Sequence, residues 1–249
     1  METECKQIDF EEVISKEHTK LPKIYWCCAH RLNLVSKNDT KQVLSKNDVF
    51  NGFISKLKII LDHQNKHQTG CTKVKEYLDK LFVKPVSTQL KSEFASISDC
   101  VRKIDENKNG VKSIMTYFEV NHFSNEEINC AKEYCKIMGP LARALDEFQG
   151  DHTVGLGMVL PIIAGLKDKL SKISSSKSLL YCQELVDVVY KSICKRFDHH
   201  LDERVYILAA ITCPRWRARW ITNVECRDKA IIAILKEEVQ KFKGKPKVW

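Results

Sequence analysis

A thiol and an imidazole lie three residues apart in the stretch WCCAHRLNLV, residues 26–35, where Cys27 and His30 have a C-x-x-H spacing. Structural zinc sites use this spacing, but such a site takes four ligands. No second pair with metal-ligand spacing follows nearby, because the later histidine pairs are four apart (His63 and His67) or adjacent. We therefore expect no bound metal and no cofactor. A structural zinc held by Cys27 and His30 is the alternative.

Aromatic and arginine side chains are interleaved near the C-terminal end of the chain, and the residues are Arg215, Trp216, Arg217, Arg219 and Trp220. Such a pattern suits stacking on bases together with neutralisation of phosphates. In the alternative interpretation, both tryptophans anchor helices in the core while the arginines stay solvated.

Positive charge predominates, with 41 Lys and Arg against 32 Asp and Glu and a net charge of +9. The first twenty residues are acidic and the C-terminal end is basic, with a lysine-rich tail that includes Lys241, Lys243 and Lys245. A basic surface favours polyanions through counterion release, and such a tail can aid nuclear import. The alternative is a solvated surface that keeps the protein soluble.

The composition, 43% apolar and 29% charged, is that of a globular chain. No apolar run approaches the roughly 20 residues that cross a bilayer, and the acidic start lacks the order of a secretion signal. Eleven scattered cysteines, an odd number, indicate reduced thiols. These features predict an intracellular protein that does not enter the membrane.

Helical periodicity dominates the chain, and nine glycines and six prolines disfavour a turn-rich β fold. The clearest helix begins at Ser124, which forms a capping box with Glu127, and its apolar stripe runs to Phe148. The pair Gly139-Pro140 is expected to kink this helix or split it in two. Further helices are expected over Asp48–Leu61, Thr72–Val83, Thr88–Ile104, Val154–Ile173, Ser178–Phe197, Val205–Ile211 and Val224–Phe242. Lys23–Cys28 is short, β-branched and aromatic, which is typical of a strand.

The stretch at 26–35, with Cys27, His30 and Asn33, resembles the C-x-x-H-x-L-N-L-V segment of hAT (hobo/Activator-type) transposases and of the BED-finger proteins descended from them. Three further segments fall in the order of that family. Thr88–Phe94 resembles its T-R-W-N-S-x-Y/F segment, and residues 148–161 are similar to its L-Q-G … T … V-L-P segment. Residues 208–216 resemble its A-A-x-L-D-P-R-F-K segment. The resemblance covers roughly residues 23 to 221.

This resemblance implies a ribonuclease-H-like fold, interrupted by a helical insertion, whose three carboxylates bind two divalent metals. Two of these carboxylates would precede the C-x-x-H segment and one would follow the insertion. The 26 residues before Cys27 contain no T-D-G or T-D-N motif, and 33 residues follow Trp216. We interpret Asp9, Glu11 and Glu12 as helix-surface acids. The expectation is a chain without catalytic residues, and the alternative is a fragment of an active transposase whose carboxylates lie in missing sequence or in another chain.

The second segment departs from the family pattern. Leu90 stands where the family has a tryptophan that stacks on an extruded base, and Gln89 replaces an arginine. A leucine cannot stack comparably, and glutamine cannot ion-pair with phosphate. Leu90 fits instead the apolar stripe of its own helix.

The sequence therefore predicts an all-α, multi-helix insertion domain with at most one or two residual strands near residues 23–35. An acidic segment is expected over 1–22, the helical domain over 23–242 and a basic tail over 243–249. The expected function is that of a non-catalytic, transposase-derived nuclear protein. Its expected partners are a second copy or other transposase-derived proteins, with weak DNA binding and no membrane or small-molecule substrate. A product without a selected role is a further alternative.

Overall fold

The computed structural model describes residues 27–66, 68–85, 90–150, 155–176, 178–201, 203–216, 220, 221, 236, 239 and 240. The elements in these ranges are helices, and no strand occurs among them, so the predicted all-α fold class is confirmed. The predicted strand at 23–28 lies mostly outside the described residues, and it is wrong for Cys28, which begins a helix. Among the described helices, none has both the length and the apolar character needed to cross a membrane.

The elements follow one another along the chain with short connections. Their order is α2 (Cys28–Leu34), the π-helix η1 (Val35–Asp39), α3 (Lys41–Ser45), α4 (Asp48–Lys66), α5 (Gln68–Leu78), α6 (Leu90–Glu106), α7 (Lys108–Tyr117), α8 (Asn125–Gln149), the short 3-10 helix η2 (Leu156–Met158), α9 (Val159–Ser175), α10 (Gln183–Leu201) and α11 (Arg204–Thr212). The helix predicted over Val224–Phe242 lies almost entirely outside the described residues.

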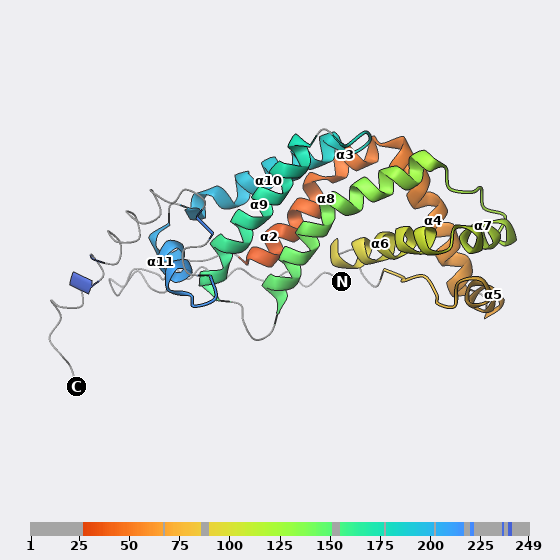
Figure 1. Ribbon diagram of the computed structural model, residues 1–249, viewed down its shortest axis with the longest axis horizontal. Helices are drawn as coiled ribbons and strands as arrows, with labels where there is room; N and C mark the ends of the chain where they lie inside the picture. Colours follow the sequence, from red (N-terminus) through yellow and green to blue (C-terminus); the bar gives the residue numbers. More distant parts are fainter. Residues whose placement is uncertain are drawn as a thin grey trace, which may run out of the picture.

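Helix α8 is the central element of the molecule (Figure 1), because it packs against α2, α4, α6 and α9. Helices α4 to α7 lie toward one end of the view, whereas α2, α9, α10 and α11 lie toward the other. Apolar side chains from α2 through α11 form one continuous core, in which Ile137, Leu141 and Leu145 of α8 are fully buried.

The start of α8 confirms the predicted capping box. The Ser124 hydroxyl accepts a hydrogen bond from the Glu127 N–H at 3.1 Å, and the Glu127 carboxylate accepts one from the Ser124 N–H at 2.7 Å. Of the two outcomes predicted for Gly139-Pro140, a kink or a split, the split is wrong, because α8 runs unbroken from Asn125 to Gln149, and the kink stays a prediction. A proline inside a helix costs one backbone hydrogen bond. Both residues of the pair are buried, and the packing of a buried helix outweighs such local preferences.

The chain between α5 and α6 also differs from the prediction. Helix α5 was expected to reach Val83 but ends at Leu78, where Asp79 takes a left-handed conformation with a φ of 60°. Aspartate tolerates this region better than most residues. Helix α7 was missed, although Asn107 caps it by accepting a hydrogen bond from the Gly110 N–H at 2.8 Å.

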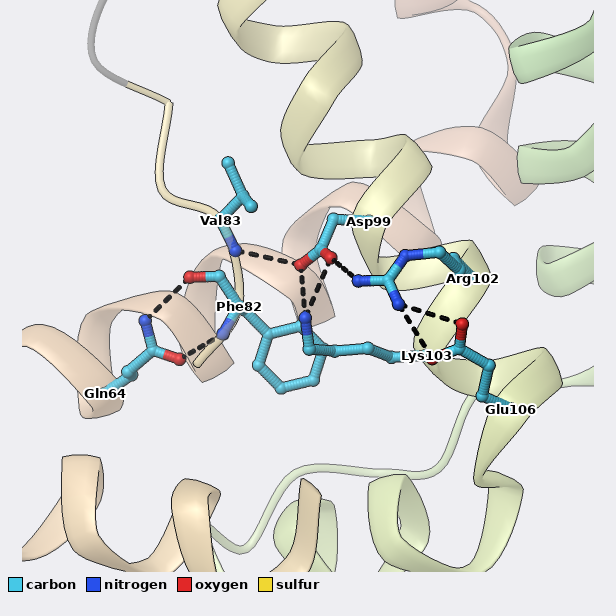
Figure 2. Close-up of polar contacts among 7 residues, drawn as sticks. All are labelled: Gln64, Phe82, Val83, Asp99, Arg102, Lys103 and Glu106. Atoms are coloured by element: carbon cyan, nitrogen blue, oxygen red, sulfur yellow. Dashed lines mark hydrogen bonds and ion pairs between the residues drawn. The ribbon is translucent and has the colours of Figure 1, made fainter. Parts of the chain in front are cut away.

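A polar network holds the extended residues after α5 against α4 and α6 (Figure 2). The Gln64 side chain pairs with both backbone groups of Phe82, at 2.8 and 3.0 Å. The next N–H, that of Val83, donates to Asp99 at 2.9 Å. The Lys103 ammonium lies 2.7 Å from the same carboxylate and neutralises its charge. Both side chains are less than a tenth exposed, so this ion pair is buried. The network therefore fixes the path that leads toward the second family-like segment.

A carboxylate of α8 caps the start of α10. Glu133 accepts hydrogen bonds from three consecutive backbone N–H groups, those of Leu180, Tyr181 and Cys182, at 2.8, 2.9 and 3.0 Å. These three amides directly precede the first residue of α10, Gln183, and a negative charge at a helix N-terminus is favourable. One side chain therefore joins α10 to the centre of α8.

Candidate functional site

The four family-like segments are far apart in the sequence, but they meet around α8 and at the C-terminal turn of that helix. The first forms α2, which packs against α8. The second begins α6, where Lys91 lies 2.5 Å from Asp146 in the last turn of α8. The neighbouring Glu147 lies 3.8 Å from Arg215 in the fourth segment. Two adjacent carboxylates in the last turn of α8, directly before the third segment, therefore contact the second and the fourth.

The third and fourth segments also meet through a close backbone contact. A Cβ added to Gly157, in η2, would lie 2.3 Å from the carbonyl oxygen of Ala209 in α11 and 3.0 Å from the Cβ of Cys213. A contact that short with backbone is not tolerated, so only glycine allows η2 and α11 to approach this closely.

The three motif residues of α2 have different environments. Cys27 and His30 are exposed, whereas the side-chain oxygen of Asn33 is buried and has no hydrogen-bond partner in the described part of the chain. Burial raises the pKa of the neighbouring Cys28 thiol to about 11, which makes it a poor thiolate ligand or nucleophile at neutral pH. Within the described ranges, Cys27 belongs to no group of side chains that could hold a metal ion.

Arg31, inside the same motif, joins α2 to the end of α10. Its Nη1 donates to the Arg196 carbonyl oxygen at 2.6 Å and lies 3.1 and 3.3 Å from the Nε2 atoms of His199 and His200. An N–H of arginine can donate only to an imidazole nitrogen that carries no proton. In His200 the other ring nitrogen, Nδ1, lies 3.1 Å from the Glu203 carboxylate and donates to it.

Protonation of His200 is disfavoured by this arrangement. Burial lowers the pKa of His200 from its ordinary value, and the nearby His199 and Arg31 lower it further, while the hydrogen bond to Glu203 opposes the shift only in part. Near neutral pH the ring therefore stays uncharged and continues to accept from Arg31.

His199, His200 and Glu203 form the one group in the described ranges whose ligand atoms lie close enough to hold a metal, within 4.8 Å of one another. Cys27 and His30 do not belong to it. The Arg31 guanidinium already lies within hydrogen-bond distance of both imidazoles of this group. A metal cation would have to displace that positive charge, so this arrangement fits an arginine rather than a metal ion.

Beside Arg31 an open pocket of about 600 Å³ lies between α2 and α10. The charged and imidazole side chains of its wall come from α2, η1 and α10, and they are His30, Arg31, Asp39, Lys195, Arg196 and His199. Arg196 and Asp39 form a bidentate ion pair with N–O distances of 2.8 to 3.0 Å. Cations therefore predominate in this wall.

The interleaved segment near the C-terminal end lies partly in the core. Trp216 and Trp220 both pack against the hydrophobic core, and the Trp216 ring nitrogen is buried without a hydrogen-bond partner in the described part of the chain. The Arg215 guanidinium lies 5.1 Å from the centre of the Trp216 ring. These positions favour the interpretation of both tryptophans as core anchors. Arg217, Arg219, Lys241, Lys243 and Lys245 lie outside the described residues.

Sequence reasoning did not identify Arg31, Arg196 or Glu203 as members of a site. The sequence gives the adjacent His199 and His200 no evident partner, because Arg31 is 168 residues from His199. The signal that could have indicated it is the arginine within the most specific motif of the chain.

No protein-family model, no curated protein and no solved structure matches this chain. Its function is therefore inferred from its residues and their geometry.

Proposed function

We propose that this chain is a non-catalytic, hAT transposase-derived helical domain that acts in the nucleus through contacts with other proteins and binds DNA weakly. The observation that carries the proposal is the meeting of the four family-like segments around α8. The second and fourth segments contact the last turn of α8 through Lys91–Asp146 and Glu147–Arg215, and the third and fourth segments meet at the Gly157–Ala209 approach, all between residues more than fifty positions apart. Motifs that belong to one ancestral scaffold are expected to pack together in this way.

The absence of catalysis is supported by the charges at this end of the molecule. Two-metal phosphoryl transfer needs several carboxylates free to bind cations. Here Asp146 and Glu147 each neutralise a basic side chain. The one metal-competent group within the described ranges contains a single carboxylate, and Arg31 contacts both of its histidines.

A nuclease assay tests this part of the proposal. The purified chain is incubated with end-labelled duplex DNA carrying hAT transposon ends, in the presence of Mg²⁺ or Mn²⁺, and the products are separated on a denaturing gel. We expect no metal-dependent strand scission. Cleavage that co-purifies with the chain and disappears with EDTA would overturn the proposal and favour a catalytic fragment.

Protein contact is tested by light scattering coupled to size-exclusion chromatography. We expect self-association, or association with a hAT transposase-derived protein added in equal amount. A chain that stays monomeric in both cases would contradict this part of the proposal.

Weak DNA binding is tested by fluorescence anisotropy over a range of salt concentrations. We compare two triple variants in which lysines are changed to glutamine. One removes the tail residues Lys241, Lys243 and Lys245, and the control removes the exposed lysines Lys75, Lys108 and Lys112 of α5 and α7. If the tail contacts phosphates, its variant should lower the slope of log K against log salt by up to about 3, and the control should not. Equal slopes in all three proteins would remove the tail from the DNA-binding surface.

A further inference from the structure

We infer that the pocket between α2 and α10 is a binding site for a phosphate group, held by the guanidinium of Arg31 and the ammonium of Lys195. The inference rests on the charges and hydrogen bonds of this pocket and does not depend on the family resemblance.

Arg31 is a half-buried cation whose positive charge is balanced by no carboxylate of the described residues. Its contacts in the described part of the chain are a carbonyl oxygen and two imidazoles, and none of these carries a negative charge. All three lie within hydrogen-bond distance of the same atom, Nη1. A guanidinium removed from water without a negative partner is energetically costly, so the site favours an anion.

The other donors of Arg31 remain available. The guanidinium carries five N–H groups in a planar fork, and this fork matches two oxygens of a phosphate. The hydrogen bonds of Arg31 to described residues all use Nη1, and the side chain lines the pocket. Among the described residues, its Nε and Nη2 groups therefore have no protein partner that competes with a ligand.

Lys195, on α10, supplies a second cation to the lining of the pocket. It is exposed, lines the pocket and forms no ion pair with any described residue. The third cation, Arg196, is neutralised by Asp39 at 2.8 Å. The pocket therefore has an excess of two positive charges, close to the charge of a phosphate monoester at neutral pH.

The size of the pocket is compatible with such a ligand. A space of about 600 Å³ that opens to solvent accepts a phosphate together with the group that carries it. Inorganic phosphate, a phosphorylated small molecule and a nucleic-acid backbone share the chemistry that this wall recognises. The experiment distinguishes these sources.

Isothermal titration calorimetry with inorganic phosphate and with pyrophosphate, at constant ionic strength, measures the site directly. The test variant is Lys195→Gln, and the matched control is Lys191→Gln, an equally exposed lysine one turn earlier on α10 that does not line the pocket. We expect saturable binding by the wild type, weakened about fivefold by Lys195→Gln and unchanged by Lys191→Gln. No saturation up to about 10 mM anion, or equal weakening by both variants, would overturn the proposal.

A second measurement reports on Arg31 without mutating a residue that holds α2 in place. In ¹⁵N-labelled protein, phosphate should shift the side-chain Nε–H resonance of Arg31 and leave that of Arg143, on α8, unchanged. A shift of both resonances, or of neither, would contradict a specific site.

Competition then identifies the source of the phosphate. If a labelled oligonucleotide is displaced by pyrophosphate and weakened by Lys195→Gln, the occupant is a backbone phosphate. If the oligonucleotide is unaffected while the anions still bind, the occupant is a free phosphorylated compound. The readout is binding, so the presence or absence of nuclease activity does not alter the result.

Discussion

Replacing Asp99 by alanine is expected to destabilise the fold more than any other change in the network of Figure 2. Lys103, with only 4% of its surface exposed, would become a buried charge without a partner, and the Val83 N–H would lose its acceptor. Breaking a buried ion pair by removing one partner costs about 3–5 kcal/mol, and an unsatisfied N–H costs about 1–3 kcal/mol. Since the two losses overlap, we expect a decrease of about 4 kcal/mol in the free energy of unfolding.

Two other variants make the expectation sharper. Lys103→Met removes the buried cation but leaves Asp99 with Arg102 and the Val83 N–H, so it should cost only about 1–2 kcal/mol. Arg102→Gln removes a half-exposed cation and should leave stability nearly unchanged. Urea unfolding followed by far-UV circular dichroism measures all three. A cost for Asp99→Ala no larger than that for Arg102→Gln would refute this reasoning.

The same network predicts a pH dependence. Burial alone would raise the pKa of Asp99, but the hydrogen bonds from Lys103, Val83 and Arg102 outweigh it and hold that pKa below its ordinary value. A carboxyl with a lowered pKa stabilises the fold above its unfolded value, near 3.9, and that contribution is lost as the pH falls through the folded value. The stability difference between wild type and Asp99→Ala should therefore shrink below about pH 4.

Three further outcomes are expected. Gly157→Ala should lower the free energy of unfolding in urea by about 1–3 kcal/mol, because its Cβ would clash with Ala209. The control Gly165→Ala, in open space on α9, should raise it by about 0.5–1 kcal/mol. Equal effects of the two variants would argue against the close contact. Trp216→Ala should lower stability by about 3 kcal/mol and leave DNA affinity unchanged; a loss of DNA affinity at constant stability would make this residue a nucleic-acid contact. The pKa of His200 is lowered in the folded state, so the contribution of the neutral ring to stability should be fully present above about pH 6.5 and should decline as the pH falls below it. His200→Gln should reduce this decline in acid titrations monitored by circular dichroism.

Local signals in the sequence were sufficient for part of the fold. The capping box and the apolar stripe of α8 depend on residues three or four positions apart, and both are present in the structure. Helix α7 was missed because only Val111, Ile114 and Met115 form its apolar face, too few for a clear period. The end of α5 depends on the conformation of Asp79 and on Gln64, which pairs with backbone beyond it. Such tertiary contacts leave no periodic trace in the sequence.

The candidate site was predictable to a smaller extent. The motif around Cys27 and His30 indicates that α2 matters, but the residue of α2 that contacts the end of α10 is Arg31. Its partners lie at the far end of the chain, and only the packing of α2, η1 and α10 around a shared core brings them together. The net charge of +9 predicts a basic surface, but it does not indicate where on the molecule a basic pocket lies.

At the Glu133 cap, a residue has an exposed surface although its backbone N–H is hydrogen-bonded within the protein. Leu180 has 81% of its surface exposed, yet its N–H is bonded to a carboxylate of α8, as are the next two amides along the chain. Hydrogen exchange at these three amides therefore requires α10 to detach from α8, and fraying of the local turn is not sufficient. In deuterated solvent this surface turn should retain its protons on the timescale of the core, and it would serve as a direct reporter of the docking of α10.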